Sequence, residues 1–116
     1  MKFDLILLPQ ADRDVDLTVN FLHSKSPRGA DAWYRQWLRA CDTLKKSADS
    51  FGVAPENDDN EFTVQQFIFK TRYGNPYRVI YRIVDRTIYV YHVRGPGQDY
   101  AADLDDVQLP DAGDDN

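Results

Sequence analysis

Residues 77–93 read YRVIYRIVDRTIYVYHV, and this stretch decides the fold. Aromatic and β-branched residues fill it, which is typical of β-strands, and the polar pair Asp85 and Arg86 interrupts it near its middle. Two runs separated by two polar residues predict an antiparallel hairpin, with strands over 77–84 and 87–93.

Side chains in a strand alternate between the two faces of the sheet. In the first strand of the hairpin one face holds Tyr77, Val79, Tyr81 and Ile83, and the other holds Arg78, Ile80, Arg82 and Val84. We expect the first face to meet helices and the second to display its arginines. Residues 62–70 have a similar composition and are followed by a turn over 73–76, so the sequence predicts a three-stranded antiparallel meander.

The N-terminal half has a different period. Residues 3–8 form a short apolar run that ends at Pro9 and predicts a strand. A first helix follows, with apolar residues at helical spacing and with acids in its first turns, where the helix dipole favours them. These acids are Asp12, Asp14 and Asp16.

A second helix is predicted after a break at Ser24 to Pro27. Ser26 is suited to cap it and Pro27 to occupy its first position. Its apolar stripe comprises Ala30, Trp33, Trp37, Cys41, Leu44 and Ala48. The fold class is therefore α+β: an N-terminal strand, a two-helix hairpin and a three-stranded meander, forming one sheet with the helices packed on one face.

We expect a single domain over residues 1–100 and an acidic tail, at least partly disordered, over 101–116. Residues 51–61 are rich in Gly, Pro, Asn and Asp and predict a loop. The single cysteine, Cys41, lies on the apolar stripe and indicates a core residue in a reducing, cytoplasmic protein. The apolar run near the N-terminus is too short for a membrane span or a signal peptide.

Charge is sorted along the chain. Residues 62–98 carry six Lys and Arg side chains against one acid, whereas the chain as a whole has a formal net charge of −5. Seven acids follow from Asp99 onward. The predicted sheet is therefore locally cationic and suited to anions. The tail either keeps the protein soluble or, tethered close to Arg94, imitates an anionic partner and weakens its binding.

The order of elements and several short motifs together resemble the RelE/ParE family of toxins from bacterial type II toxin-antitoxin modules. The residues that carry the resemblance are Asp12, 17–22, 26–30, Trp33, Leu38, Leu44, 54–56, 69–70, 77–83 and 90–94. The resemblance spans roughly residues 1–100 and implies the RelE/ParE-like arrangement of the elements predicted above.

The resemblance also implies an activity. Members similar to RelE cleave messenger RNA on the ribosome without metal or cofactor, by attack of the RNA 2′-hydroxyl on the adjacent phosphate. Such a site moves two protons and stabilises a charged phosphorane, and clustered cations can serve both needs. The candidate catalytic residues are Lys70, Arg78, Arg94 and Tyr100, and the candidate substrate-binding residues are Arg72 and Arg82. No metal site is predicted.

Structural roles remain open for several of these residues. Arg78 or Arg82 could instead pair with Glu56, Glu61 or Asp85, and Arg94 with the acidic tail. His92 has a suitable ordinary pKa for proton transfer, but its place inside a strand favours a partly buried histidine.

The function likewise has alternatives. The main hypothesis is a ribosome-associated mRNA endoribonuclease that inhibits growth. The loop after the last strand adds no basic residue beyond Arg94, and the net charge is low, which favours a ParE-like inhibitor of DNA gyrase or a catalytically degenerate antitoxin-binding relative. All three imply a cognate antitoxin as partner. The other partners are the ribosome with mRNA, or DNA gyrase, and none of the hypotheses involves a membrane.

Overall fold

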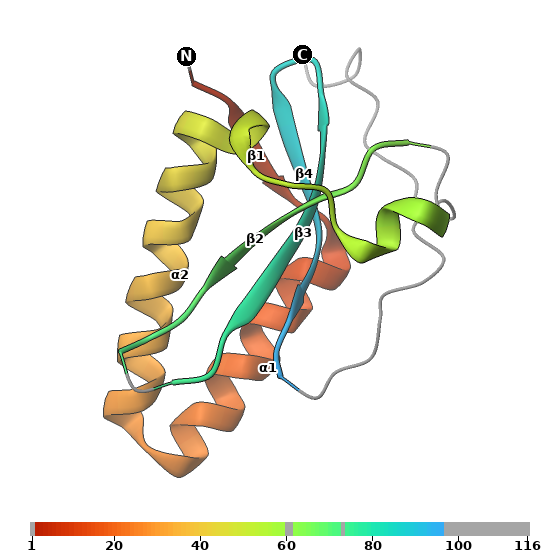
Figure 1. Cartoon of the computed structure of the whole chain (residues 1–116). Coiled ribbons are helices and arrows are strands. Elements are labelled where there is room, and N and C mark those ends of the chain that lie inside the picture. The colour runs from red at the N-terminus through yellow and green to blue at the C-terminus, as the bar shows by residue number, and fades with distance from the viewer. Residues whose placement is uncertain (1, 60–61, 73, 97–116) are drawn as a thin grey trace.

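The computed structural model describes residues 2–59, 62–72 and 74–96, and it contains one sheet with two helices against it (Figure 1). The strands are β1 (Asp4–Leu7), β2 (Gln65–Phe69), β3 (Tyr77–Val84) and β4 (Thr87–Arg94). The helices are α1 (Pro9–Lys25) and α2 (Pro27–Ser47), with two 3-10 turns, η1 (Ala48–Ser50) and η2 (Pro55–Asp59). The predicted α+β order of strand, helical hairpin and meander is confirmed.

The sheet is mixed, with strand order β1-β4-β3-β2. The meander is antiparallel, as expected, and β1 adds to its edge in parallel with β4. Because β1 is only four residues long, its pairing runs from Thr87 to Val90, and the second half of β4 pairs with β3 alone and has no strand neighbour on its other edge. Helix α1 begins directly after β1 and takes up that place.

Two element boundaries differ from the prediction. The strand expected over 62–70 is shorter, because Val64 accepts a hydrogen bond from the backbone N–H of Ala54 instead of pairing with β3. The segment expected as a loop over 51–61 contains the 3-10 turn η2. Val53 and Ala54 are thereby held against Gln65 and Val64, beside the sheet.

The main core lies between the helices and the sheet. Ser26 caps α2 by accepting a hydrogen bond from the Gly29 N–H, and the predicted apolar stripe of this helix is buried. Its two indoles, Trp33 and Trp37, stack with ring centroids 6.4 Å apart. Cys41 packs at the border of this core, and burial raises the pKa of its thiol to about 11, so it stays protonated at neutral pH, as expected for a core residue rather than a nucleophile.

Strand β4 contains one extra residue, Tyr91. Ile88 and Val90 are buried under the helices, and strict alternation would carry His92 and Arg94 to the same side. The pairing with β3 shifts at this point, so that the residues on either side of Tyr91 oppose consecutive residues of β3. This is a β-bulge, and it reverses the faces for the rest of the strand.

The bulge determines where the end of β4 points. Beyond it, Val93 pairs with Val79 and is buried under the helices, and Arg94 pairs with Arg78. Since Arg78 and Val79 face opposite sides, Arg94 lies on the face away from the helices. Sequence alternation alone predicts the reverse for this residue.

The face away from the helices is only half open, which corrects the expectation that it simply displays arginines. A second core covers the half around Ile80, where residues 54–59 and 62–64 fold over β3 and β4. Its buried members are Leu8, Ala54, Val64, Ile80, Tyr89 and Tyr91, with Phe62 and Val84 packed at its border. In the part of the chain that the structure describes, no such core covers the other half, around Arg78, and Ile68 of β2 is 53% exposed there.

Tyr81 anchors the sheet to the end of the helical hairpin. Its buried hydroxyl donates a 2.6 Å hydrogen bond to the Ala48 carbonyl. We expect Tyr81→Phe to lower the free energy of unfolding by about 1 kcal/mol, the usual cost of one lost hydrogen bond, as measured by urea denaturation. Tyr34→Phe, on the exposed face of α2, is the matched control and should change stability by less than about 0.5 kcal/mol. Equal stability of the two variants would contradict the anchoring role.

Candidate functional site

Three of the predicted basic residues come together on the uncovered half of the sheet. Arg78 of β3 lies between Ile68 of β2 and Arg94 of β4 in the pairing register. Directly paired residues have Cβ atoms about 5 Å apart. Lys70 is exposed just beyond β2, and alternation from Ile68 places it on the same side. We call this surface, made by Lys70, Arg78 and Arg94, the cationic face.

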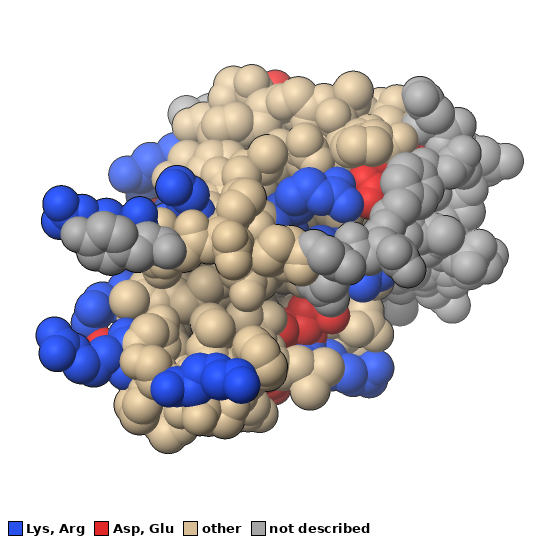
Figure 2. Space-filling view, turned by 60° about the horizontal axis from the view of Figure 1, so that its bottom comes forward, with Lys and Arg blue, Asp and Glu red and all other residues tan. Residues whose placement is uncertain are grey.

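Figure 2 looks toward the end of the molecule that is lowest in Figure 1. Basic side chains stand there in separate groups on a largely uncharged surface, and acidic atoms adjoin the central group. The positive charge is therefore distributed and partly compensated, unlike the continuous basic stripe of a protein that binds long nucleic acids through many phosphates.

Arg78 is held by a buried acid. Its Nη1 and Nη2 atoms donate to the two carboxylate oxygens of Glu56, at 2.9 and 2.8 Å, and Nη1 also donates to Gln66 Oε1 at 3.0 Å. Glu56 is fully buried, whereas the Arg78 side chain is 25% exposed. The hydrogen bonds that Arg78 donates to Glu56 raise the pKa of Arg78 despite its burial. One of the predicted alternatives, a structural pairing of Arg78 with Glu56, is thus present.

Arg78 keeps some of its N–H groups free of this pairing. A guanidinium has five N–H groups, and Arg78 donates three of them to Glu56 and Gln66. The remaining two, one on Nε and one on Nη2, are available to a ligand. The catalytic role predicted for Arg78 remains a prediction, with Glu56 as a component that the sequence did not assign to the site.

Arg94 differs from its neighbour Arg78. It is partly exposed, and among the residues that the structure describes it forms no ion pair. Its Nε atom is buried without a hydrogen-bond partner. Because Glu56 balances Arg78, Arg94 supplies the uncompensated positive charge of the pair. The alternative pairing of Arg94 with the acidic tail involves residues outside the described ranges.

Two other predicted residues, Arg82 and Arg72, do not join the cationic face. Arg82 lies on the same side of β3, but its guanidinium stacks 4.1 Å from the ring centroid of Phe62 and belongs to the second core. Arg72 lines a cavity of about 410 Å³ on the side of the helical hairpin, with Trp33 and Tyr77. Tyr100 lies outside the described residues.

That cavity continues toward a second hollow of about 350 Å³, with which it shares Leu22, Asn75 and Tyr77. Leu17 and Phe21 of α1 line the second hollow, and about 60% of each side chain is exposed. Sequence reasoning missed this apolar surface, because these two residues lie outside the stripe that faces the sheet.

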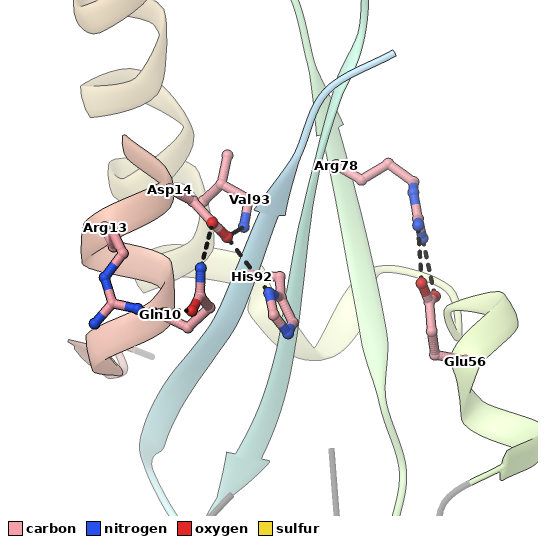
Figure 3. A network of polar contacts seen from close by, with 7 residues as sticks. All are labelled: Gln10, Arg13, Asp14, Glu56, Arg78, His92 and Val93. Carbon is pink, nitrogen blue, oxygen red and sulfur yellow. Dashed lines mark hydrogen bonds and ion pairs between the residues drawn. The ribbon is translucent and has the colours of Figure 1, made fainter. Parts of the chain in front are cut away.

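A second polar cluster, at the edge of β4, was also missed (Figure 3). Asp14 is buried on α1 and accepts hydrogen bonds from the Val93 N–H at 3.0 Å and from Gln10 Nε2 at 2.8 Å. The first of these bonds satisfies a backbone donor that β1 is too short to reach. The carboxylate is therefore the edge partner of β4, not only a helix-dipole acid as the sequence predicted.

His92 belongs to the same cluster. Its Nδ1 atom lies 3.4 Å from Asp14 Oδ2, an ion-pair contact without hydrogen-bond geometry. The His92 side chain is 13% exposed, which confirms the prediction of a partly buried histidine. Burial opposes the charge on Asp14, but His92, the Val93 N–H and Gln10 outweigh it and lower the pKa of Asp14.

No family model matches this chain, and no curated protein matches its sequence. No described helix is long and apolar enough to cross a membrane. Within the described ranges, no three His, Cys, Asp or Glu side chains are grouped so that they could hold a metal ion.

We expect Asp14→Ala to lower the free energy of unfolding at pH 7 by about 2 kcal/mol, because it removes a charged acceptor from the buried Val93 N–H. The folded-state pKa lies below the ordinary value of 3.8, so ionised Asp14 stabilises the fold above that pH. This contribution is lost as the pH falls through the folded-state pKa. Urea denaturation at several pH values should show the difference from wild type narrowing in acid.

The matched control is Asp16→Ala, which removes an exposed acid from the same helix. It should leave stability within about 0.5 kcal/mol of wild type. A difference between wild type and Asp14→Ala that does not change between pH 7 and pH 2 would contradict the role of the ionised carboxylate.

Proposed function

We propose that this chain is the toxin of a type II toxin-antitoxin module and that it inhibits growth by cleaving messenger RNA at the ribosome. The observation that carries the proposal is the assembly of Lys70, Arg78 and Arg94 on one uncovered half-face of the sheet. These cations come from the three consecutive strands of the meander and their ends. The sequence resemblance to RelE/ParE toxins supports the same function.

The chemistry of the cationic face fits phosphodiester cleavage. Arg94, with no ion pair to the described residues, and the two remaining N–H groups of Arg78 offer donors for phosphate oxygens. Such donors stabilise the charge that develops on the phosphorane. Lys70 adds a mobile ammonium at the border, where it can protonate the leaving oxygen.

One observation favours a second function. The bidentate pair with Glu56 engages the fork of Arg78 that would otherwise hold a phosphate, and the hollow beside Leu17 and Phe21 exposes an apolar surface suited to a protein partner. Both features fit a toxin that binds and arrests DNA gyrase without hydrolysis. An antitoxin, the partner that either function requires, would complement the cationic face with acidic residues.

The function is tested by inducing the protein in bacteria and mapping cuts in translated transcripts. We expect wild type to arrest growth with cut messages, and Arg94→Ala to reduce cleavage at least about 10²-fold, the usual effect of removing one donor to a charged transition state. Arg39→Ala, which removes an exposed arginine from α2, is the matched control and should cleave like wild type.

Growth arrest without cut messages would contradict the nuclease proposal. In that case the gyrase hypothesis predicts inhibition of purified gyrase in a supercoiling assay and DNA damage in the induced cells. Failure of the protein to affect growth, transcripts or gyrase would contradict both functions.

A further inference from the structure

The geometry around His92 points to a role that the resemblance does not assign. We propose that His92 is the proton-transfer residue of the cationic face and that Asp14 is its positioning residue. The inference rests on the proposed nuclease function and names the group that takes the proton from the RNA 2′-hydroxyl. Three observations carry it: the bulge in β4, the contact between the side chains of His92 and Asp14, and the exposure of the Nε2 atom of His92.

The bulge places His92 beside the arginines. His92 pairs with Ile80, which faces away from the helices, and Arg94 pairs with Arg78 on the same side. His92 and Arg94 are two residues apart along β4, about 7 Å at the usual rise of a strand. A phosphate bound by the arginine pair would therefore hold its attached ribose within reach of the imidazole.

Asp14 orients the ring. Gln10 and the Val93 N–H fix the carboxylate, and the Nδ1 atom of His92 faces it at 3.4 Å (Figure 3). An ionised carboxylate at this position favours the tautomer with its proton on Nδ1 and leaves Nε2 as the acceptor. Nε2 makes no hydrogen bond to the described residues. Unlike Nδ1, it is not completely buried, so a ligand can approach it.

The charges around the imidazole suit proton transfer. Asp14 on α1 stabilises the imidazolium once it forms, whereas Arg94 of β4 and Arg78 of β3 oppose it. Glu56 on η2 balances Arg78, so the net influence on His92 comes from one acid and one uncompensated arginine.

The proposed step moves one proton to the imidazole and exchanges one bond at phosphorus for another. The 2′-hydroxyl gives its proton to Nε2 of His92, the 2′-oxygen forms a bond to phosphorus, and the bond from phosphorus to the 5′-oxygen breaks. The 5′-oxygen takes a proton from the Lys70 ammonium, which leaves a 2′,3′-cyclic phosphate and a 5′-hydroxyl. The imidazolium then returns its proton to solvent, and Lys70 regains a proton from solvent. No metal, oxidant or co-reactant enters the step.

The test measures cleavage of a defined messenger on translating ribosomes by purified full-length variants across pH 5 to 8. His92→Gln should lower the cleavage rate 10²- to 10⁴-fold and abolish the loss of rate in acid that a histidine base imposes. Asp14 Oδ2 both accepts from the Val93 N–H and faces His92 Nδ1, so Asp14→Asn can retain this oxygen while it removes the negative charge beside the ring. It should slow cleavage with an intact thermal unfolding transition. His23→Gln, an exposed histidine at the end of α1, is the matched control and should match wild type.

The outcomes separate the two proposals. If wild type cuts no message, the nuclease function fails, and the role of His92 fails with it. If wild type cuts and His92→Gln cuts at the same rate with the same pH profile, only the role of His92 is overturned. If His92→Gln does not fold, the proposal is tested by the cleavage rate of Asp14→Asn and by the pH dependence of the wild-type cleavage rate. A wild-type rate that is independent of pH below 7 would overturn the proposal.

Discussion

The arrangement of the site depends on one constraint, the backbone pairing of β4 after β1 ends. An unpaired N–H at Val93 would cost about 1–3 kcal/mol if it were buried without an acceptor. Asp14 supplies that acceptor from α1, and the bulge at Tyr91 turns the strand so that Val93 still enters the main core. The same turn carries His92 and Arg94 to the opposite face. The cationic face is therefore a consequence of how the edge of β4 is completed.

The acid that covers part of the sheet explains how Arg78 and Arg94 can be neighbours. Side-by-side guanidinium groups repel each other, more strongly where water is partly excluded. Glu56 reduces this cost because the turn η2 brings its carboxylate to Arg78, where it is fully buried and accepts hydrogen bonds from both Nη atoms. Removing either partner of such a pair leaves a buried charge without compensation. Glu56 thus stabilises the fold and, by the same contact, limits how Arg78 meets a ligand.

Much of the fold could be predicted from the sequence because its signals are local. Period-two alternation fixed the faces of β3, and the cap and stripe of α2 fixed which side of that helix is buried. The faces at the end of β4 could not be predicted, because a bulge breaks the alternation and depends on pairing with another strand. The pairing of Glu56 with Arg78 was one of the predicted alternatives, but the burial of Glu56 and of Asp14 was missed for a related reason: each is an acid in a polar context, and only long-range packing buries it.

The pair of Arg78 with Glu56 and the bulge in β4 affect the two proposed activities differently. A binding toxin needs only the surface charge and shape, and both survive when Arg78 stays locked to Glu56. A nuclease needs in addition a proton acceptor and donors that point at one phosphate. Two of the residues proposed for these tasks, Arg94 and His92, lie beyond the bulge in β4, whereas Arg82 of β3 is engaged in packing. Under the nuclease proposal, the residues that a binding toxin would not need are therefore concentrated in the last four residues of β4.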